Sequence, residues 1–206
     1  MNLGLERVEL GPWPMNCYLI RCPATWSVAI VDPGADTQQI LEALGEDEPC
    51  CILLTHGHPD HVGALDDVRQ ATGIPVGIHP ADASRFQIEA DFPLLDGMEV
   101  QVGERLVRVV HAPGHTPGSV CLRLGGEVLV GDVIFPGGPG HTESHLALRQ
   151  SLRSLSATVF TWADETGLHP GHGQSTTVGA ERQAFEAFMN SEHPPDLHGD
   201  VSWRQP

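Results

Sequence analysis

The chain has 206 residues, enough for one large domain with a substantial core. Its net charge is −16, from 27 acidic and 11 basic residues, so its surface should repel phosphate backbones, and nucleic acid is a poor partner. No apolar run approaches the ~20 residues of a membrane span, and residues 1–7 lack the basic and apolar regions of a signal peptide.

The five cysteines are odd in number and lie in apolar, strand-like segments. This pattern predicts reduced cysteines in a cytoplasmic protein and no disulfide framework. We therefore expect a cytoplasmic location, with no membrane partner. The sequence leaves the oligomeric state open, a homodimer included.

Hydrophobic spacing in the N-terminal half predicts three strands followed by alternating helices and strands. We expect the strands over 3–10, 15–21, 27–31, 50–54 and 74–78. The helices are expected over 37–44, 60–72 and 80–88.

The second half repeats the pattern of paired strands followed by helices. A hairpin of 98–102 with 105–110 and a pair of 120–124 with 128–130 precede helices over 144–155 and 178–189. Two such halves predict a mixed α/β fold with two sheets packed face to face and helices outside, in one domain over 1–190. The Pro-rich tail, 191–206, is expected to pack on the surface.

Four potential metal ligands lie within the segment 55–61, Thr-His-Gly-His-Pro-Asp-His. It follows an apolar run that we expect to be a buried strand, and its glycine and proline end that strand. In an extended tail the imidazoles of His56 and His58 project to the same side, and Asp60 is a favourable cap for the next helix. Together with His61, these side chains suit zinc, iron or manganese.

Three further candidate ligands follow later apolar strands, each at an abrupt Gly or Pro turn. They are His115, Asp132 and His172, the last flanked by glycines that let the backbone come close. Four residues cannot complete the coordination of a metal pair, whereas seven can.

The pattern His56-x-His58-x-Asp60-His61, followed by His115, Asp132 and His172, resembles the metallo-β-lactamase superfamily. The resemblance covers residues 8 to about 189 and implies a four-layer αββα sandwich with a metal pair at one edge. It implies a first ion on His56, His58 and His115, and a second on Asp60, His61 and His172. Asp132 would bridge two divalent transition-metal ions, for which we expect zinc, with iron and manganese open.

Within that superfamily the chain is most similar to the glyoxalase II-like branch, through segments 16–19, 32–34, 112–119 and 170–173. The helical domain that grips glutathione in full-length glyoxalase II has no counterpart in these residues. We therefore expect a small thioester or ester substrate with little preference for glutathione.

The expected chemistry is hydrolysis by a hydroxide shared between two metals, whose water has a pKa lowered toward ~7. Asp60 is a candidate proton acceptor, and His141, which follows Asp132 at the expected mouth of the site, is a candidate substrate contact. Asp32, Thr55, Thr116 and Ser119 are candidates to orient the ligand imidazoles.

Three other functions remain open. A mononuclear iron persulfide dioxygenase would use His56 or His58 with His115 and Asp132. A lactonase would share the hydrolytic centre with a different substrate. A non-catalytic metal-binding protein is disfavoured because the ligand set is intact.

Overall fold

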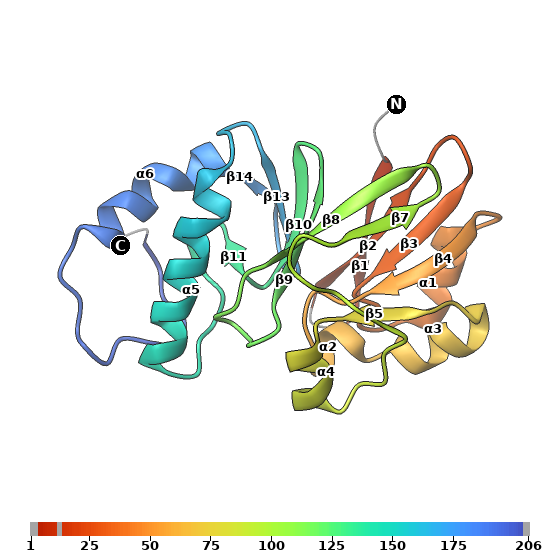
Figure 1. Ribbon diagram of the computed structural model, residues 1–206, viewed down its shortest axis with the longest axis horizontal. Coiled ribbons are helices and arrows are strands. Elements are labelled where there is room, and N and C mark those ends of the chain that lie inside the picture. Colours follow the sequence, from red (N-terminus) through yellow and green to blue (C-terminus); the bar gives the residue numbers. More distant parts are fainter. Residues whose placement is uncertain (1–3, 12–13, 204–206) are drawn as a thin grey trace.

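Two six-stranded sheets pack face to face, with helices on their outer surfaces (Figure 1). The structure, a computed structural model, describes residues 4–11 and 14–203. Among these residues, no helix combines the length and apolarity required to cross a bilayer. All five cysteines are free, as predicted.

The N-terminal half forms the first sheet, whose strands lie side by side in chain order. Its first three strands are antiparallel neighbours, and the remaining pairs are parallel. The strands are β1 (Gly4–Leu10), β2 (Met15–Arg21), β3 (Ser27–Val31), β4 (Glu48–Leu53), β5 (Val76–Ile78) and β6 (Phe92–Pro93). The helices of this half are α1 (Thr37–Leu44), α2 (Pro59–Val62), α3 (Leu65–Thr72) and α4 (Pro80–Phe86).

The second sheet has the order β14-β13-β10-β9-β8-β7, with one parallel pair between β10 and β13. Its strands are β7 (Glu99–Val102), β8 (Arg105–His111), β9 (Val120–Leu124), β10 (Glu127–Gly131), β13 (Gly167–Pro170) and β14 (Thr176–Thr177). A small ribbon of β11 (Ile134–Phe135) and β12 (Gly138–Pro139) follows β10. The helices are α5 (His145–Ala157), the 3-10 turn Val159–Thr161 and α6 (Val178–Met189).

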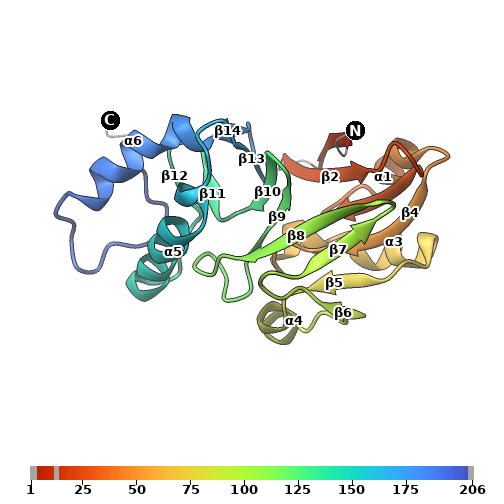
Figure 2. The same ribbon diagram turned by 45° about the horizontal axis from the view of Figure 1, so that its top comes forward.

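Three apolar clusters hold the layers together. Side chains such as Ile20, Leu53 and Leu122 lie between the two sheets. A second cluster joins the first sheet to α1 and α3, and a third joins the second sheet to α5 and α6. Figure 2 shows these helix pairs on opposite flanks of the molecule. The predicted αββα sandwich is confirmed.

The single helix predicted over 60–72 is instead two helices, α2 and α3. The interruption falls at Gly63 and Ala64, where the chain packs against another loop. The backbone N–H of Ala64 donates to Pro33 O at 2.9 Å. Gly63 lies so close to Gly34 that a Cβ there would clash with Gly34 O. The cap prediction for Asp60 was also wrong. Asp60 lies in the first turn of α2, whose N-cap position is His58.

The tail, for which we expected a surface location, contributes to the core of the second half. Val201 and Trp203 are buried in the cluster beneath α5 and α6. The backbone of Gly199 pairs with that of Thr142. Residues 199–203 therefore support the loop that follows β12.

Candidate metal centre

The segment 55–61 connects the end of β4 to α2 and places two imidazoles in one direction. His56 is completely buried, whereas His58 is half-buried. Gly57, between them, lies against the ring of Phe86, and a Cβ there would clash with that ring. Pro59 starts α2, so the chain turns directly after His58.

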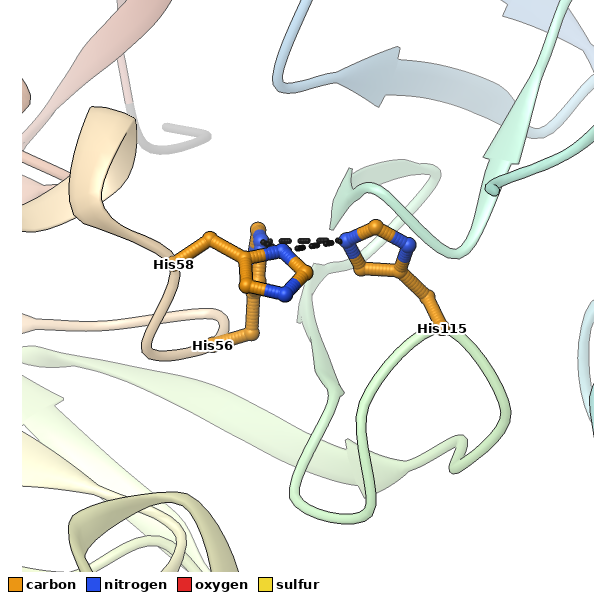
Figure 3. Close-up of side chains that lie close together, drawn as sticks. All are labelled: His56, His58 and His115. Atoms are coloured by element: carbon orange, nitrogen blue, oxygen red, sulfur yellow. Dashed lines mark hydrogen bonds between the residues drawn. The ribbon is translucent and has the colours of Figure 1, made fainter. Parts of the chain in front are cut away.

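The first group of ligand atoms comprises one nitrogen each from His56, His58 and His115. His56 Nε2 lies 3.1 Å from His58 Nδ1 and 3.3 Å from His115 Nε2, and the latter two atoms are 2.9 Å apart (Figure 3). Nitrogens bound tetrahedrally to one zinc ion at ~2.0–2.1 Å would be roughly 3.3–3.4 Å apart. The triangle therefore has the dimensions of a tripod for one ion.

A second group of ligand atoms lies beside the first and contains Asp60, His61 and His172. His172 Nε2 is 3.0 Å from Asp60 Oδ2. Asp132, just after β10, lies between the groups. Its Oδ1 is 3.3 Å from His61 Nε2, and its Oδ2 is 3.6 Å from His115 Nε2 and 3.8 Å from His172 Nε2.

The structure thus brings together all seven residues that we predicted as metal ligands. They come from both sheets: four follow β4, and the others follow β8, β10 and β13.

Two imidazoles of the first group, those of His56 and His58, are kept neutral. Burial, followed by the neighbouring imidazole of His61, holds the pKa of His56 well below its usual range. Burial and His115 lower the pKa of His58 in the same way. Neutral imidazoles have a lone pair for a metal, so this electrostatic environment favours ligation.

The second group carries paired charges. Burial alone would lower the pKa of His61, but the carboxylates of Asp132 and Asp32 raise it to about 10. The hydrogen bond between His172 and Asp60 raises the pKa of the imidazole and lowers that of the carboxyl. The protons on these two imidazoles lie where a cation could replace them.

Asp32 orients two of the imidazoles through one buried carboxylate. Its Oδ2 lies 2.9 Å from His61 Nδ1 and accepts from Thr55 Oγ1 at 2.6 Å, while Oδ1 accepts from the Thr55 N–H. Since the Thr55 hydroxyl donates to Asp32, it can accept from His56 Nδ1, 3.2 Å away. These contacts confirm the orienting role predicted for Asp32 and Thr55.

Backbone carbonyls orient two other imidazoles. His115 Nδ1 donates to His141 O at 2.8 Å, and His172 Nδ1 donates to Pro14 O at 2.9 Å. A carbonyl oxygen can only accept, so the Nδ1 atoms carry hydrogens and the Nε2 atoms point into the site.

Two buried polar atoms at the centre indicate that the ligand set fits a cation. His61 Nε2 and Asp132 Oδ1 lie 3.3 Å apart, yet neither atom makes a hydrogen bond of good geometry among the described residues, although both are shielded from solvent. Buried polar atoms without partners are uncommon in folded proteins. A Cβ at Gly171 would clash with His61 and with Asp132 Oδ1, so the glycine keeps this space open.

The remaining predicted residues have other contacts. Thr116 and Ser119 bond each other, and Thr116 Oγ1 donates to Asp82 rather than to an imidazole. Their prediction as imidazole-orienting groups was wrong. His141 contacts the centre through its backbone carbonyl, while its exposed ring bonds Asp200 at 3.0 Å.

Sequence reasoning missed Asp82, a completely buried carboxylate in α4. Its oxygens accept from Gly57 N–H at 3.0 Å, Thr116 Oγ1 at 2.7 Å and Gly118 N–H at 2.7 Å. An acidic residue in the first turn of a short helix usually indicates only a favourable helix dipole. Nothing in its local pattern pointed to the metal centre.

The sequence matches the metallo-beta-lactamase superfamily over residues 10–178. Among curated relatives, the hydroxyacylglutathione hydrolase GloC of Haemophilus influenzae is 30% identical over 217 residues. That alignment covers 92% of this chain and 100% of GloC.

Two solved structures are similar to this chain along most of its length. TTHA1623 in a di-iron-bound form has 32% identity and a TM-score of 0.69, with 86% of this chain and 97% of that chain covered. ETHE1 from Myxococcus xanthus has 27% identity and a TM-score of 0.78, with 87% of this chain and 82% of that chain covered.

Proposed function

The chain belongs to the metallo-β-lactamase superfamily, and on that premise we propose that it is a hydrolase that uses two divalent metal ions to cleave a small thioester or ester. One observation carries the proposal: two groups of ligand atoms lie side by side, with the Asp132 carboxylate between them. The similarity to a hydroxyacylglutathione hydrolase supports the thioester class.

When bound, two such ions supply a water of lowered pKa and polarise a carbonyl group. His56, His58 and His115 would hold the first ion, and Asp60, His61 and His172 the second, with Asp132 shared. Zinc suits these ligands, and iron and manganese remain within the proposal. The di-iron-bound form of TTHA1623 supports a dinuclear centre.

Asp60 is the proposed proton acceptor in the reaction. Its side chain is half exposed, so it can reach the space in front of the centre, and its Oδ2 is held by His172. Hydrolysis adds water across the acyl–sulfur or acyl–oxygen bond, and the carboxylate takes the proton that the attacking water loses. His141, whose ring is 55% exposed, is the proposed substrate contact.

The extent of glutathione recognition is a separate part of the proposal. Because GloC aligns over its whole length with this chain, an acyl-glutathione is a substrate to test beside simpler acyl thioesters and lactones. We propose that the thioester is cleaved with or without the glutathione part.

The similarity to ETHE1 favours one alternative, an iron-dependent dioxygenase acting on a persulfide. That reaction would need one ion, held by His56 or His58 with His115 and Asp132. The number of ions and the consumption of oxygen therefore separate the two functions.

The test is a hydrolysis screen with protein of defined metal content. Acyl-glutathione, other acyl thioesters and lactones are compared under anaerobic conditions, and oxygen uptake is measured with glutathione persulfide. Metal analysis should give two ions per chain, and His172→Ala should lose one of them. Oxygen consumption that depends on iron, with no hydrolysis of any substrate, would replace the hydrolase by the dioxygenase.

A further inference from the structure

A carboxylate outside the proposed ligand set joins the two loops that supply the first group of ligand atoms. His56 and His58 come from the loop after β4 in the first sheet, whereas His115 comes from the loop between β8 and β9 in the second. Asp82, in α4, is completely buried and hydrogen-bonds to both loops.

On the first loop, Asp82 fixes the residue between the two ligands. Its Oδ2 accepts from the Gly57 N–H at 3.0 Å. One helical turn later in α4, Phe86 packs its ring against Gly57 and meets the His58 ring edge-on at 5.2 Å. Residues four apart lie on one helix face, so α4 holds this loop by a polar and an apolar contact.

On the second loop, Asp82 bonds to residues on the C-terminal side of His115. Thr116 Oγ1 donates to Oδ2 and the Gly118 N–H donates to Oδ1, both at 2.7 Å. A Cβ at Gly118 would lie 2.6 Å from Oδ1, so the close approach requires glycine. Ser119 Oγ, in turn, accepts from the Thr116 N–H at 3.1 Å.

We propose that Asp82 is a positioning residue that sets the separation of His115 from His56 and His58, and thereby the metal affinity of the first site. One carboxylate satisfies two donors on the second loop and one on the first, so it acts on that separation directly. The backbone bond from Val120 N–H to Thr55 O, 2.9 Å, is a second link between these loops. The inference rests on the proposed function for one point only, that the group bound by these three imidazoles is a metal ion.

Loss of an outer contact of this kind typically lowers metal affinity about 10–100-fold. We therefore expect Asp82→Asn to weaken the His56/His58/His115 site by about that factor. The Asp60/His61/His172 site should keep its affinity because its orienting bonds go to Asp32 and Pro14.

The experiment measures zinc affinity by chelator competition in two backgrounds of the full chain. His172→Ala leaves the first site alone, and His58→Ala leaves the second. Asp82→Asn should weaken binding only in the His172→Ala background. The absorption spectrum of bound cobalt should change in that background and not in the other.

Two controls separate positioning from a general loss of stability. Glu181→Gln alters another completely buried carboxylate, which accepts from Gly137 N–H and Trp203 Nε1, and should leave first-site affinity unchanged. Thr116→Val removes one of the three hydrogen bonds to Asp82, together with the bond between the Thr116 and Ser119 hydroxyls. It should weaken the first site less than Asp82→Asn, whereas Thr116→Ser should retain the affinity.

Equal weakening of both sites by Asp82→Asn, or unchanged first-site affinity, would overturn the positioning role. If the His172→Ala chain binds no ion at all, the two-site proposal fails instead. In that case, Asp82→Asn and Glu181→Gln are each made without a ligand substitution, and the total metal affinity is measured. Only Asp82→Asn should lower that affinity.

Discussion

Replacing Asp32 by asparagine tests whether the carboxylate beneath the centre supports both the fold and the metal. Asp32 has a left-handed backbone, with φ of 52°, which Asn adopts as readily as Asp. The change therefore preserves the backbone and the shape of the side chain. It removes the negative charge and converts one acceptor oxygen into a donor.

The expected cost follows from the contacts of the two oxygens. An asparagine that keeps its oxygen at the Oδ2 position retains Thr55 Oγ1 and His61 Nδ1, but its amide faces the Thr55 N–H. A buried donor without an acceptor costs about 1–3 kcal/mol, and the loss of charge from the remaining bonds adds about 1 kcal/mol. The free energy of unfolding should fall by about 2–4 kcal/mol, and metal affinity about 10–100-fold.

Urea unfolding of metal-free protein measures the first quantity, and chelator competition the second. The matched control is Asp36→Asn, because Asp36 also has a left-handed backbone, with φ of 49°, and accepts a backbone N–H, that of Gly11. Asp36 is exposed and belongs to none of the ligand groups, so its change should be mild. Similar losses in both variants would refute the reasoning about Asp32.

Three further predictions concern the metal centre. Asp60→Asn should lower kcat far more than it changes KM, as steady-state kinetics would show; an unchanged kcat would exclude it as the proton acceptor. Chelation should lower the melting temperature, because the ions bind only the folded chain, and Asp132→Ala should lower it in metal-replete buffer; identical melting curves would contradict this. In metal-free protein, the pKa of His61 is raised from 6.5 to about 10. Its stabilising contribution is thus complete below pH 6.5 and lost as the pH rises through about 10. Urea unfolding across that range should show the decline, and His61→Gln should abolish it.

The sequence predicted the fold well wherever side-chain periodicity and backbone signals agreed. The strands 15–21 and 27–31 and the helices 37–44 and 178–189 have the predicted bounds. Prediction failed where distant backbone contacts decide the structure. The break between α2 and α3 depends on the packing of Gly63 against Gly34, and no local pattern encodes that contact.

The ligand set was predictable because each residue follows a strand at a sharp turn, in an order that resembles a known superfamily. The residues that hold these ligands in place were harder to predict. Asp32 and Thr55 were candidates to orient the imidazoles, as Thr116 and Ser119 were, and local sequence could not separate the first two from the last two. Asp82 is separated from both loops in the chain, and only the tertiary structure brings it to them.

The distribution of the ligands over two sheets has a consequence for local opening of the folded chain. An ion held by His56 and His115, or by His61 and His172, would be a reversible cross-link between distant points of the polypeptide. Closing a long loop costs configurational entropy that grows only slowly with its length, and such a link is made only after the fold has already closed that loop. Removing the ions should therefore loosen the apposition of the two halves as a unit, with hydrogen exchange rising along both sheets and not only in the loops that hold the ligands.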